Sequence, residues 1–171
     1  LSEYGVDAVD GYVVDSDQCF SSNYPTYLAP TIEDHDITKD VSESTVIEVN
    51  AVGMTTQSNV RSTLTVEPLL KTSAAAFSRV DNKETSIEKV SSDINGPFNV
   101  AVAVTDQISD STDSEEKATK IAVYGSYFFA DKSFTSSNPF GNRAMILNTL
   151  SWLSGSETST LAIPTRSLDV Q

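Results

Sequence analysis

The segment of residues 120–155 constrains the fold more than any other part of this chain. It opens on the apolar run Ile121–Tyr124, whose branched and aromatic side chains favour an extended strand. After a loop, apolar residues recur at helical spacing and stop just before Gly155, a residue suited to the left-handed conformation that ends helices. The apolar positions of this helix are Ile146, Leu147, Leu150 and Leu153, with Met145 and Trp152 beside them. We therefore expect a buried strand, a loop and a helix that packs this apolar face on the core.

A short, unbroken apolar run is typical of a strand covered on both faces, as in parallel or mixed sheets between helices. Asn142 is the predicted N-cap of the helix, because its side chain can accept a hydrogen bond from an orphan backbone N–H. Pro68 cannot donate to a ladder, so it predicts an edge, a bulge or the end of regular pairing. Further strands are predicted at residues 8–15, 45–52, 62–72 and 98–105. The sequence thus predicts an α/β fold with a mixed, largely parallel sheet flanked by helices.

Length and charge limit the number of domains and the kinds of partner that the chain can have. The 171 residues fit one domain, placed at residues 1–164, with a tail at residues 165–171 and an acidic loop at residues 106–117. The 24 acidic against 11 basic residues give a net charge of −13. This charge argues against binding nucleic acid, which relies on Lys and Arg to neutralise phosphates, and against lying on an anionic membrane. The chain contains no run of 18 apolar residues that could span a bilayer.

No residue pattern in the chain indicates catalysis. Cys19 and His35 are the only residues of their kinds, and Cys19 lacks the flanking glycines of a nucleophile elbow. A zinc site needs several His or Cys ligands, and the glycine-rich phosphate-binding motifs are absent. The acids Asp15 and Asp17 and the acidic loop leave incidental calcium binding open, although neither has the spacing of an EF-hand loop. We therefore predict a non-enzymatic protein with no catalytic residue, no metal and no cofactor.

A weaker pattern concerns ligand binding. Ser73, Ser126 and Tyr127 follow predicted strands, and Asn142 opens the predicted helix. In open α/β sheets, ligands sit beyond the carboxyl ends of parallel strands, and the N–H groups at a helix start can bind an anion. These four residues are therefore candidate ligand-binding residues if the strands are parallel. The alternative is that they serve turns and caps within the fold.

Several segments, taken in order, resemble one protein family: EPLLKTSAAAF, GPFNVAVAV, KIAVYGSYFF, GNRAMILNTLSWLSG and IPTRSLDV. The opening LSEYGVDAVDGYVVD and the later HDIT are similar to the middle portion of the same family. This family is the extracytoplasmic domain of the Gldg-type (gliding-motility-associated) auxiliary component of ABC-type transport systems. The resemblance implies a flavodoxin-like or glutamine-amidotransferase-like fold, of which this chain would be a partial domain whose first strands precede Leu1.

The same resemblance implies a setting for the domain. It would be extracytoplasmic and anchored to the cell membrane, with residues 165–171 leading toward a transmembrane helix that this chain lacks. The permease and ATPase subunits of the transporter would be its partners. The amidotransferase nucleophile elbow is absent, so the resemblance carries no enzymatic activity over to any residue here.

Three hypotheses about function follow from these observations. The leading one is a non-enzymatic, extracytoplasmic accessory domain of an ABC-type transport system that binds a partner protein or a ligand. The first alternative is a module that binds a small ligand, either a sugar or a peptide, at the predicted strand ends. The second alternative is a degenerate relative of amidotransferases or hydrolases.

Overall fold

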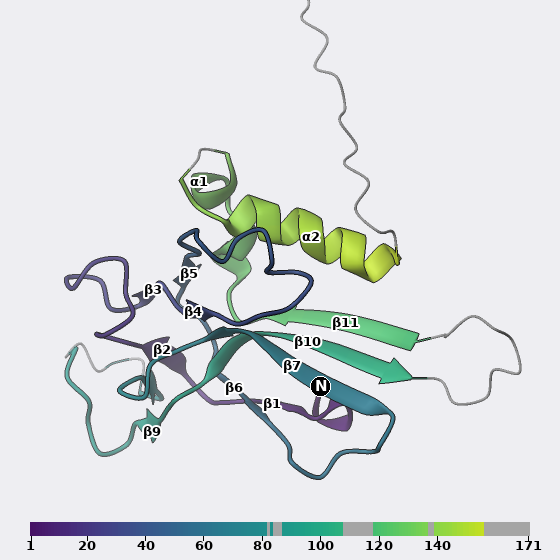
Figure 1. Ribbon diagram of the computed structural model, residues 1–171. Coiled ribbons are helices and arrows are strands. Elements are labelled where there is room, and N and C mark those ends of the chain that lie inside the picture. Colours follow the sequence, from purple (N-terminus) through teal and green to yellow (C-terminus); the bar gives the residue numbers. More distant parts are fainter. Residues whose placement is uncertain (82, 84–86, 108–117, 137–138, 156–171) are drawn as a thin grey trace, which may run out of the picture.

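Three antiparallel sheets and one long helix make up the protein in the computed structural model (Figure 1). The structure describes residues 1–81, 83, 87–107, 118–136 and 139–155. Within this part of the chain, every pair of neighbouring strands runs antiparallel. Helices α1 and α2 lie together on one side of the largest sheet (Figure 1).

The largest sheet is built around β10 (Asn99–Gln107). One edge of β10 pairs with β7 (Leu64–Lys71), and the other pairs with β11 (Ala118–Tyr124). Three shorter strands complete this sheet. Strand β6 (Met54–Thr56) pairs with the start of β10, and β1 (Val6–Ala8) pairs with β6. Strand β4 (Thr31–Ile32) pairs with β7.

Two smaller sheets and four helical segments complete the described structure. The three-stranded sheet has the order β2-β8-β9, and the two-stranded sheet pairs β3 with β5. The bounds of these strands are Tyr12–Val14 for β2, Tyr27–Leu28 for β3, Glu48–Val49 for β5, Phe77–Arg79 for β8 and Ile94–Asn95 for β9. The helices are η1 (Ser2–Tyr4), η2 (Tyr127–Ala130), α1 (Lys132–Thr135) and α2 (Asn142–Ser154).

The predicted α/β fold is wrong, because the described sheets are antiparallel and not largely parallel or flavodoxin-like. A parallel pair needs a crossover of a dozen or more residues, usually helical. Here η1 precedes the first strand, and the other described helices follow β11, so no described helix connects two strands. The apolar run Ile121–Tyr124 is compatible with either pairing, since β-propensity reflects side-chain packing and not strand direction.

The strand predicted at residues 98–105 is confirmed as β10, and it forms the centre of the core. Its side chains alternate between two apolar clusters. Ala101 and Ala103 belong to the cluster that also contains Met145 of α2. Val102 and Val104 belong to the second cluster, with Val6, Met54 and Leu64. Both faces of β10 are therefore covered, which explains a strand without polar alternation.

The strand predicted at Ile121–Tyr124 is present within β11, but its predicted burial on both faces is wrong. Among the described strands, β11 pairs with β10 alone, so it lies at an edge of the sheet. Its side chains from Ile121 to Tyr124 are half-buried. Ile121 and Val123 pack on one apolar cluster, whereas Tyr124 packs on the other.

The remaining predicted strands are shorter than expected or contain an irregularity. Gly11, with a φ of 95°, divides residues 8–15, because β1 ends before it and β2 begins after it. Of residues 45–52, only Glu48–Val49 forms regular strand. The strand at residues 62–72 is confirmed as β7, and Pro68 lies beside a register shift in its pairing with β10.

Part of the predicted organisation lies outside the described residues. The acidic loop predicted at residues 106–117 is described only at Asp106 and Gln107, which belong to β10. The tail at residues 165–171 is not described. The division between a domain at residues 1–164 and that tail therefore stays a prediction.

Helix α2 is confirmed in its extent but not in its orientation. It ends at Ser154, and Gly155 adopts the predicted left-handed conformation with a φ of 66°. The predicted apolar face is wrong, because Leu147 is 55% exposed and Leu150 is 59% exposed. Leu153 is also exposed. The buried residues of α2 are Asn142, Met145 and Thr149, and Ile146 and Trp152 pack partly on the core.

Asn142 explains this orientation of α2. The N-cap is Gly141, and the buried amide of Asn142 instead pairs with the backbone of Ile47, 95 positions away in the sequence. Its Oδ1 accepts from the Ile47 N–H at 3.0 Å, and its Nδ2 donates to the Ile47 carbonyl at 2.8 Å and to the Phe129 carbonyl at 3.2 Å. Buried backbone groups must find partners, so these bonds turn Asn142 inward and fix the rotation of the helix.

Asn142→Ala is expected to lower the free energy of unfolding by about 3 kcal/mol, since it leaves several buried backbone groups unpaired. Urea denaturation measures the loss. The matched control is Asn148→Ala on the same helix, whose amide donates one bond, to the Ile37 carbonyl at 3.1 Å. The control is expected to cost about 1 kcal/mol. Equal losses in both variants would contradict the role given to Asn142.

Candidate functional site

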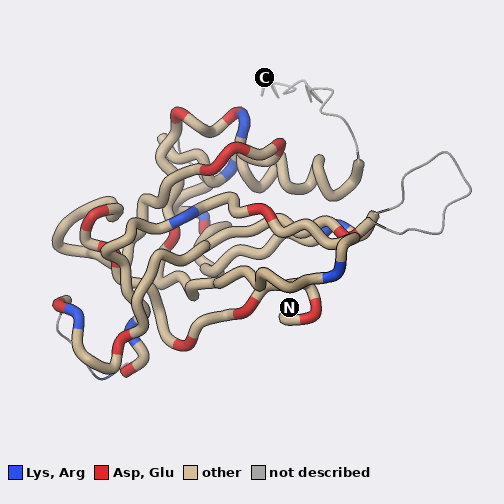
Figure 2. Tube along the Cα trace, turned by 60° about the horizontal axis from the view of Figure 1, so that its bottom comes forward, with Lys and Arg blue, Asp and Glu red and all other residues tan. Residues whose placement is uncertain are grey.

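An open cavity of about 360 Å³ lies where helix α2, strand β7 and the segment after β4 meet. It is lined by Asp34, His35, Asp36, Lys39, Glu67 and Trp152. The segment after β4 provides the first four residues, β7 provides Glu67 and α2 provides Trp152. Acidic residues recur along this segment beside α2, and others are spread over the rest of the molecule (Figure 2).

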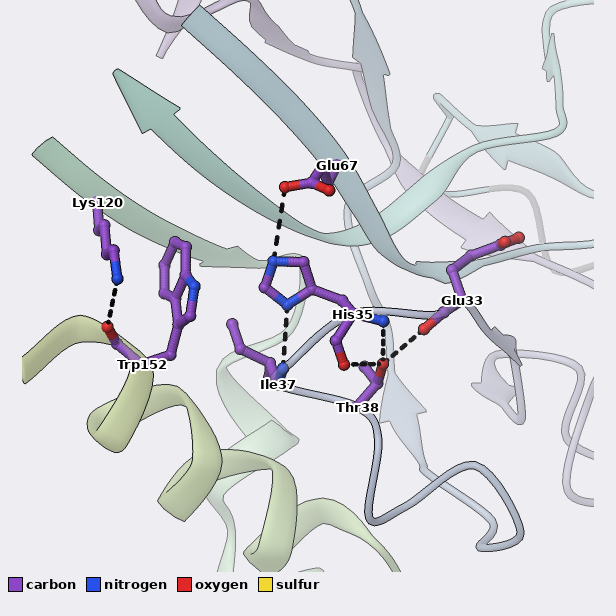
Figure 3. A network of polar contacts seen from close by, with 7 residues as sticks. All are labelled: Glu33, His35, Ile37, Thr38, Glu67, Lys120 and Trp152. Atoms are coloured by element: carbon purple, nitrogen blue, oxygen red, sulfur yellow. Dashed lines mark hydrogen bonds and ion pairs between the residues drawn. The ribbon is translucent and has the colours of Figure 1, made fainter. Parts of the chain in front are cut away.

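His35 is held in one orientation at the wall of this cavity (Figure 3). Its Nδ1 accepts a hydrogen bond from the Ile37 N–H at 3.0 Å, so the proton of the neutral imidazole lies on Nε2. The Thr38 hydroxyl accepts from the His35 N–H at 3.0 Å and donates to the Glu33 carbonyl at 2.6 Å. These bonds close a tight turn, and they leave only 6% of the His35 side chain exposed.

The Nε2 atom of His35 faces the carboxylate of Glu67 across 3.7 Å (Figure 3). This separation is too long for a hydrogen bond, although it lies within ion-pair distance when the imidazole is protonated. The Glu67 side chain is 48% exposed and comes from a strand position that faces away from the second apolar cluster. A polar atom of a ligand that approaches this pair from the side can therefore lie within hydrogen-bond distance of both groups.

Trp152 forms another wall of the cavity. Its ring meets the His35 ring edge to face, with centroids 5.4 Å apart. The Lys120 ammonium lies 4.9 Å from the indole centroid and donates to the Trp152 carbonyl at 3.1 Å (Figure 3). A cation over an indole ring is an attractive arrangement, so Lys120 of β11 and His35 together hold the ring in place.

The lining of the cavity suits binding better than nucleophilic chemistry. It contains hydrogen-bond acceptors in three carboxylates and donors in Lys39 and the His35 Nε2–H, but no Ser, Thr or Cys. Within the part of the chain that the structure describes, no group of three or more His, Cys, Asp or Glu side chains is arranged to hold a metal ion. The arrangement can therefore hold a polar molecule by hydrogen bonds.

Cys19 lies apart from this cavity. Its thiol donates to the Ser16 carbonyl at 3.6 Å, and burial together with the nearby Asp15 carboxylate raises the pKa of the thiol. A raised pKa keeps the thiol protonated and makes it a weaker nucleophile at neutral pH. None of the contacts found among the described residues joins Cys19 to His35.

The residues predicted to bind a ligand do not form one rim. The Ser126 hydroxyl donates to the Val49 carbonyl at 2.5 Å, and the Asn142 amide is bound to the Ile47 backbone. Ser73 instead bonds Asp15, through its N–H and its hydroxyl, each at 2.8 Å. Tyr127 is 83% exposed. The parallel sheet on which this rim depends is absent from the described structure, and the ligand roles of these four residues stay a prediction.

A second titratable group, Glu48 of β5, is buried in the protein and lies outside the cavity lining. Its side chain is fully buried, and neither carboxyl oxygen has a hydrogen-bond partner within the described residues. Burial raises the pKa of Glu48 well above its usual value. Burial also raises the pKa of the neighbouring Tyr124 to about 12, with a smaller contribution from Glu48.

Tyr124 does not compensate the burial of Glu48. The Tyr124 hydroxyl lies 2.6 Å from the Thr149 hydroxyl, which itself donates to the Met145 carbonyl at 2.7 Å. A hydroxyl has one proton, so Thr149 must accept from Tyr124, and the only proton of the phenol is used in that bond. Glu48 is therefore a buried carboxyl group without a compensating hydrogen bond among the described residues, and its burial favours the neutral form.

The outer side of α2 is the largest departure from the predicted packing. Leu147, Leu150 and Leu153 are exposed residues of α2, and we call them the outer face of α2. Figure 1 shows α2 on the outside of the molecule. Of the helices in the described residues, none has the length and apolar character needed to cross a bilayer.

Comparison of the chain with protein families, with curated proteins and with solved structures found no match. The assignment to a family therefore stays a prediction from the resemblance.

Sequence reasoning singled out His35 but missed the residues that surround it. Glu67 and Trp152 lie far from His35 in the sequence and join it only because β7 and α2 meet the segment after β4. A weak signal is present in β7, where Thr65 and Glu67 alternate with the half-buried Val66. This alternation places Glu67 on a solvent-facing side of the strand, but it does not reveal what lies opposite.

Proposed function

We propose that this chain is a non-enzymatic, extracytoplasmic accessory domain of an ABC-type transport system, and that it binds a partner protein through the outer face of α2. The observation that carries the proposal is the exposure of three leucines on one side of a single helix. Contiguous apolar groups left in water are typical of surfaces that another molecule covers. The order of the segments that resemble transporter auxiliary components supplies the setting.

The permease and ATPase subunits of the transporter are the proposed partners. A domain outside the membrane meets the permease, so the permease is the subunit that we expect at the outer face of α2. Leu150 lies near the middle of this face and is its most exposed member, at 59%. Central apolar residues dominate the energy of most interfaces, so Leu150 is the residue to change. Neighbouring genes for an ATPase and a permease would support this setting, whereas an isolated gene for a cytosolic protein would contradict it.

The test uses the full-length protein in the membranes of its source organism. We expect the tagged protein to co-purify with permease and ATPase subunits, and Leu150→Asp to lower their recovery by about tenfold or more. The matched control is Ile87→Asp, because Ile87 is 58% exposed and belongs to the segment between β8 and β9. The control should keep recovery within about twofold.

Two results would overturn the proposal. The first is a wild-type preparation that contains no transporter subunit. The second is equal recovery of the permease with Leu150→Asp and with Ile87→Asp, which would show that the outer face of α2 is not the contact.

A further inference from the structure

We propose that the cavity beside α2 binds a small saccharide, with Glu67 as its main hydrogen-bond acceptor. This site is separate from the outer face of α2, and the inference does not depend on the partner proposed for that face. The cavity has a volume of about 360 Å³, at the lower end of the range for pockets that hold small molecules.

His35 presents an unmatched hydrogen-bond donor at the cavity. Only 6% of its side chain is exposed. Its Nε2–H has no hydrogen-bond partner among the described residues. The Glu67 carboxylate lies 3.7 Å away. A hydroxyl can accept from Nε2–H and donate to the carboxylate at the same time, because it is both donor and acceptor. A hydroxyl of a ligand would thus give both groups a partner.

The rest of the lining has the same mixed character. Asp34 and Asp36 can only accept hydrogen bonds when they are ionised, whereas Lys39 can only donate them. A molecule with several hydroxyl groups can satisfy both kinds of group, whichever way it is turned. Trp152 adds an apolar wall for the C–H groups of a sugar ring.

The charges in the cavity lining argue against an anionic ligand and against a cationic ligand. An anionic ligand would face the carboxylates of Asp34, Asp36 and Glu67. An organic cation would be attracted by these three groups but opposed by Lys39 and by the Lys120 ammonium, which already lies over the Trp152 ring. A neutral, hydroxylated molecule avoids both repulsions, and it uses every polar group in the lining.

Trp152 is the only tryptophan in the chain, so its fluorescence reports on this cavity directly. The probes are glucose, galactose, N-acetylglucosamine and maltose, each titrated to about 100 mM because sites with few contacts bind in the millimolar range. We expect a saturable change with at least one of these sugars. Glu67→Ala should weaken that binding by about tenfold or more, since it removes a charged hydrogen-bond acceptor.

The matched control is Glu43→Ala, which changes the net charge equally at an exposed residue outside the cavity lining. It should leave the affinity within about twofold. An unchanged melting temperature of Glu67→Ala, whose side chain is half-exposed, shows that its fold is intact. The proposal is overturned if none of the four sugars changes the fluorescence, if both variants weaken binding equally, or if spermidine alone gives a saturable response.

Discussion

Glu48→Gln is expected to stabilise the protein progressively as the pH rises above 4.5, the usual pKa of a glutamate. In the folded state, burial without a partner raises the pKa of Glu48 well above 4.5, whereas in the unfolded chain the carboxyl group ionises near pH 4.5. The folded-state pKa is raised, so the contribution of Glu48 to stability is fully present below pH 4.5 and is lost as the pH rises. Glutamine has nearly the same shape but does not titrate, so the variant avoids this loss.

The measurement compares urea denaturation of the two proteins from pH 4 to pH 8. Above pH 4.5, as long as Glu48 stays protonated in the folded protein, the stability difference should grow by about 1.4 kcal/mol per pH unit. The difference between the proteins isolates Glu48, because all other titrating groups are common to both. The control is Glu43→Gln, because Glu43 is exposed and lies shortly before Glu48 in the sequence. A difference that does not change with pH, or the same slope in the control, would show that Glu48 is not the group responsible.

Asp93→Ala is expected to lower the free energy of unfolding by about 3 kcal/mol, because it removes the buried carboxylate that pairs with the Arg79 guanidinium. The Arg79 Nε donates to Asp93 Oδ1 at 2.9 Å, and both side chains are almost completely buried. The Val90 N–H donates to the other carboxylate oxygen at 2.8 Å. The expected loss is at the lower end for broken buried pairs, since Arg79 ends β8 and Asp93 precedes β9 in the small sheet, which does not include β10.

The pH dependence of Asp93 has the opposite sign to that of Glu48. Burial alone would raise the pKa of Asp93, but the bonds from Val90 and Arg79 outweigh it and lower the pKa below its usual 3.8. The stabilisation by this pair is therefore present above pH 3.8 and is lost as the pH falls through the folded-state pKa.

The control for Asp93→Ala is Asp106→Ala at the exposed pair of Arg61 and Asp106. This pair is short, at 2.6 Å, but solvent screens it, so its loss should move the urea midpoint far less. Equal midpoint shifts in the two variants would contradict the importance given to burial of the Arg79–Asp93 pair.

Elements with a strong local signal could be predicted from the sequence. Runs of β-branched residues predict the strands β10 and β7. Helical spacing of apolar residues, together with Gly155, predicts the extent of α2. These features depend on near neighbours in the chain, and the same neighbours are present in the folded protein. The direction of strand pairing is different, because an apolar run packs equally well beside a parallel or an antiparallel strand.

The orientation of α2 shows why the candidate site could not be predicted in the same way. Apolar spacing favoured burial of Leu147 and Leu150, but the bonds of Asn142 to the Ile47 backbone turn these leucines toward solvent. A buried amide that pairs with three backbone groups outweighs the partial exposure of leucines, since unpaired buried groups cost about 1–3 kcal/mol each. Ile47 lies 95 positions before Asn142, so no local pattern reveals this contact.

The linear order of residues is sufficient to establish an acidic chain whose strands precede one long, glycine-terminated helix. Other features arise only when distant segments pack together. They are the direction of strand pairing, the exposure of the α2 leucines and the cavity lined by His35, Glu67 and Trp152. The physical reason is that propensity and capping act over a few residues, whereas a buried polar group such as Asn142 takes its partners from wherever the fold brings them.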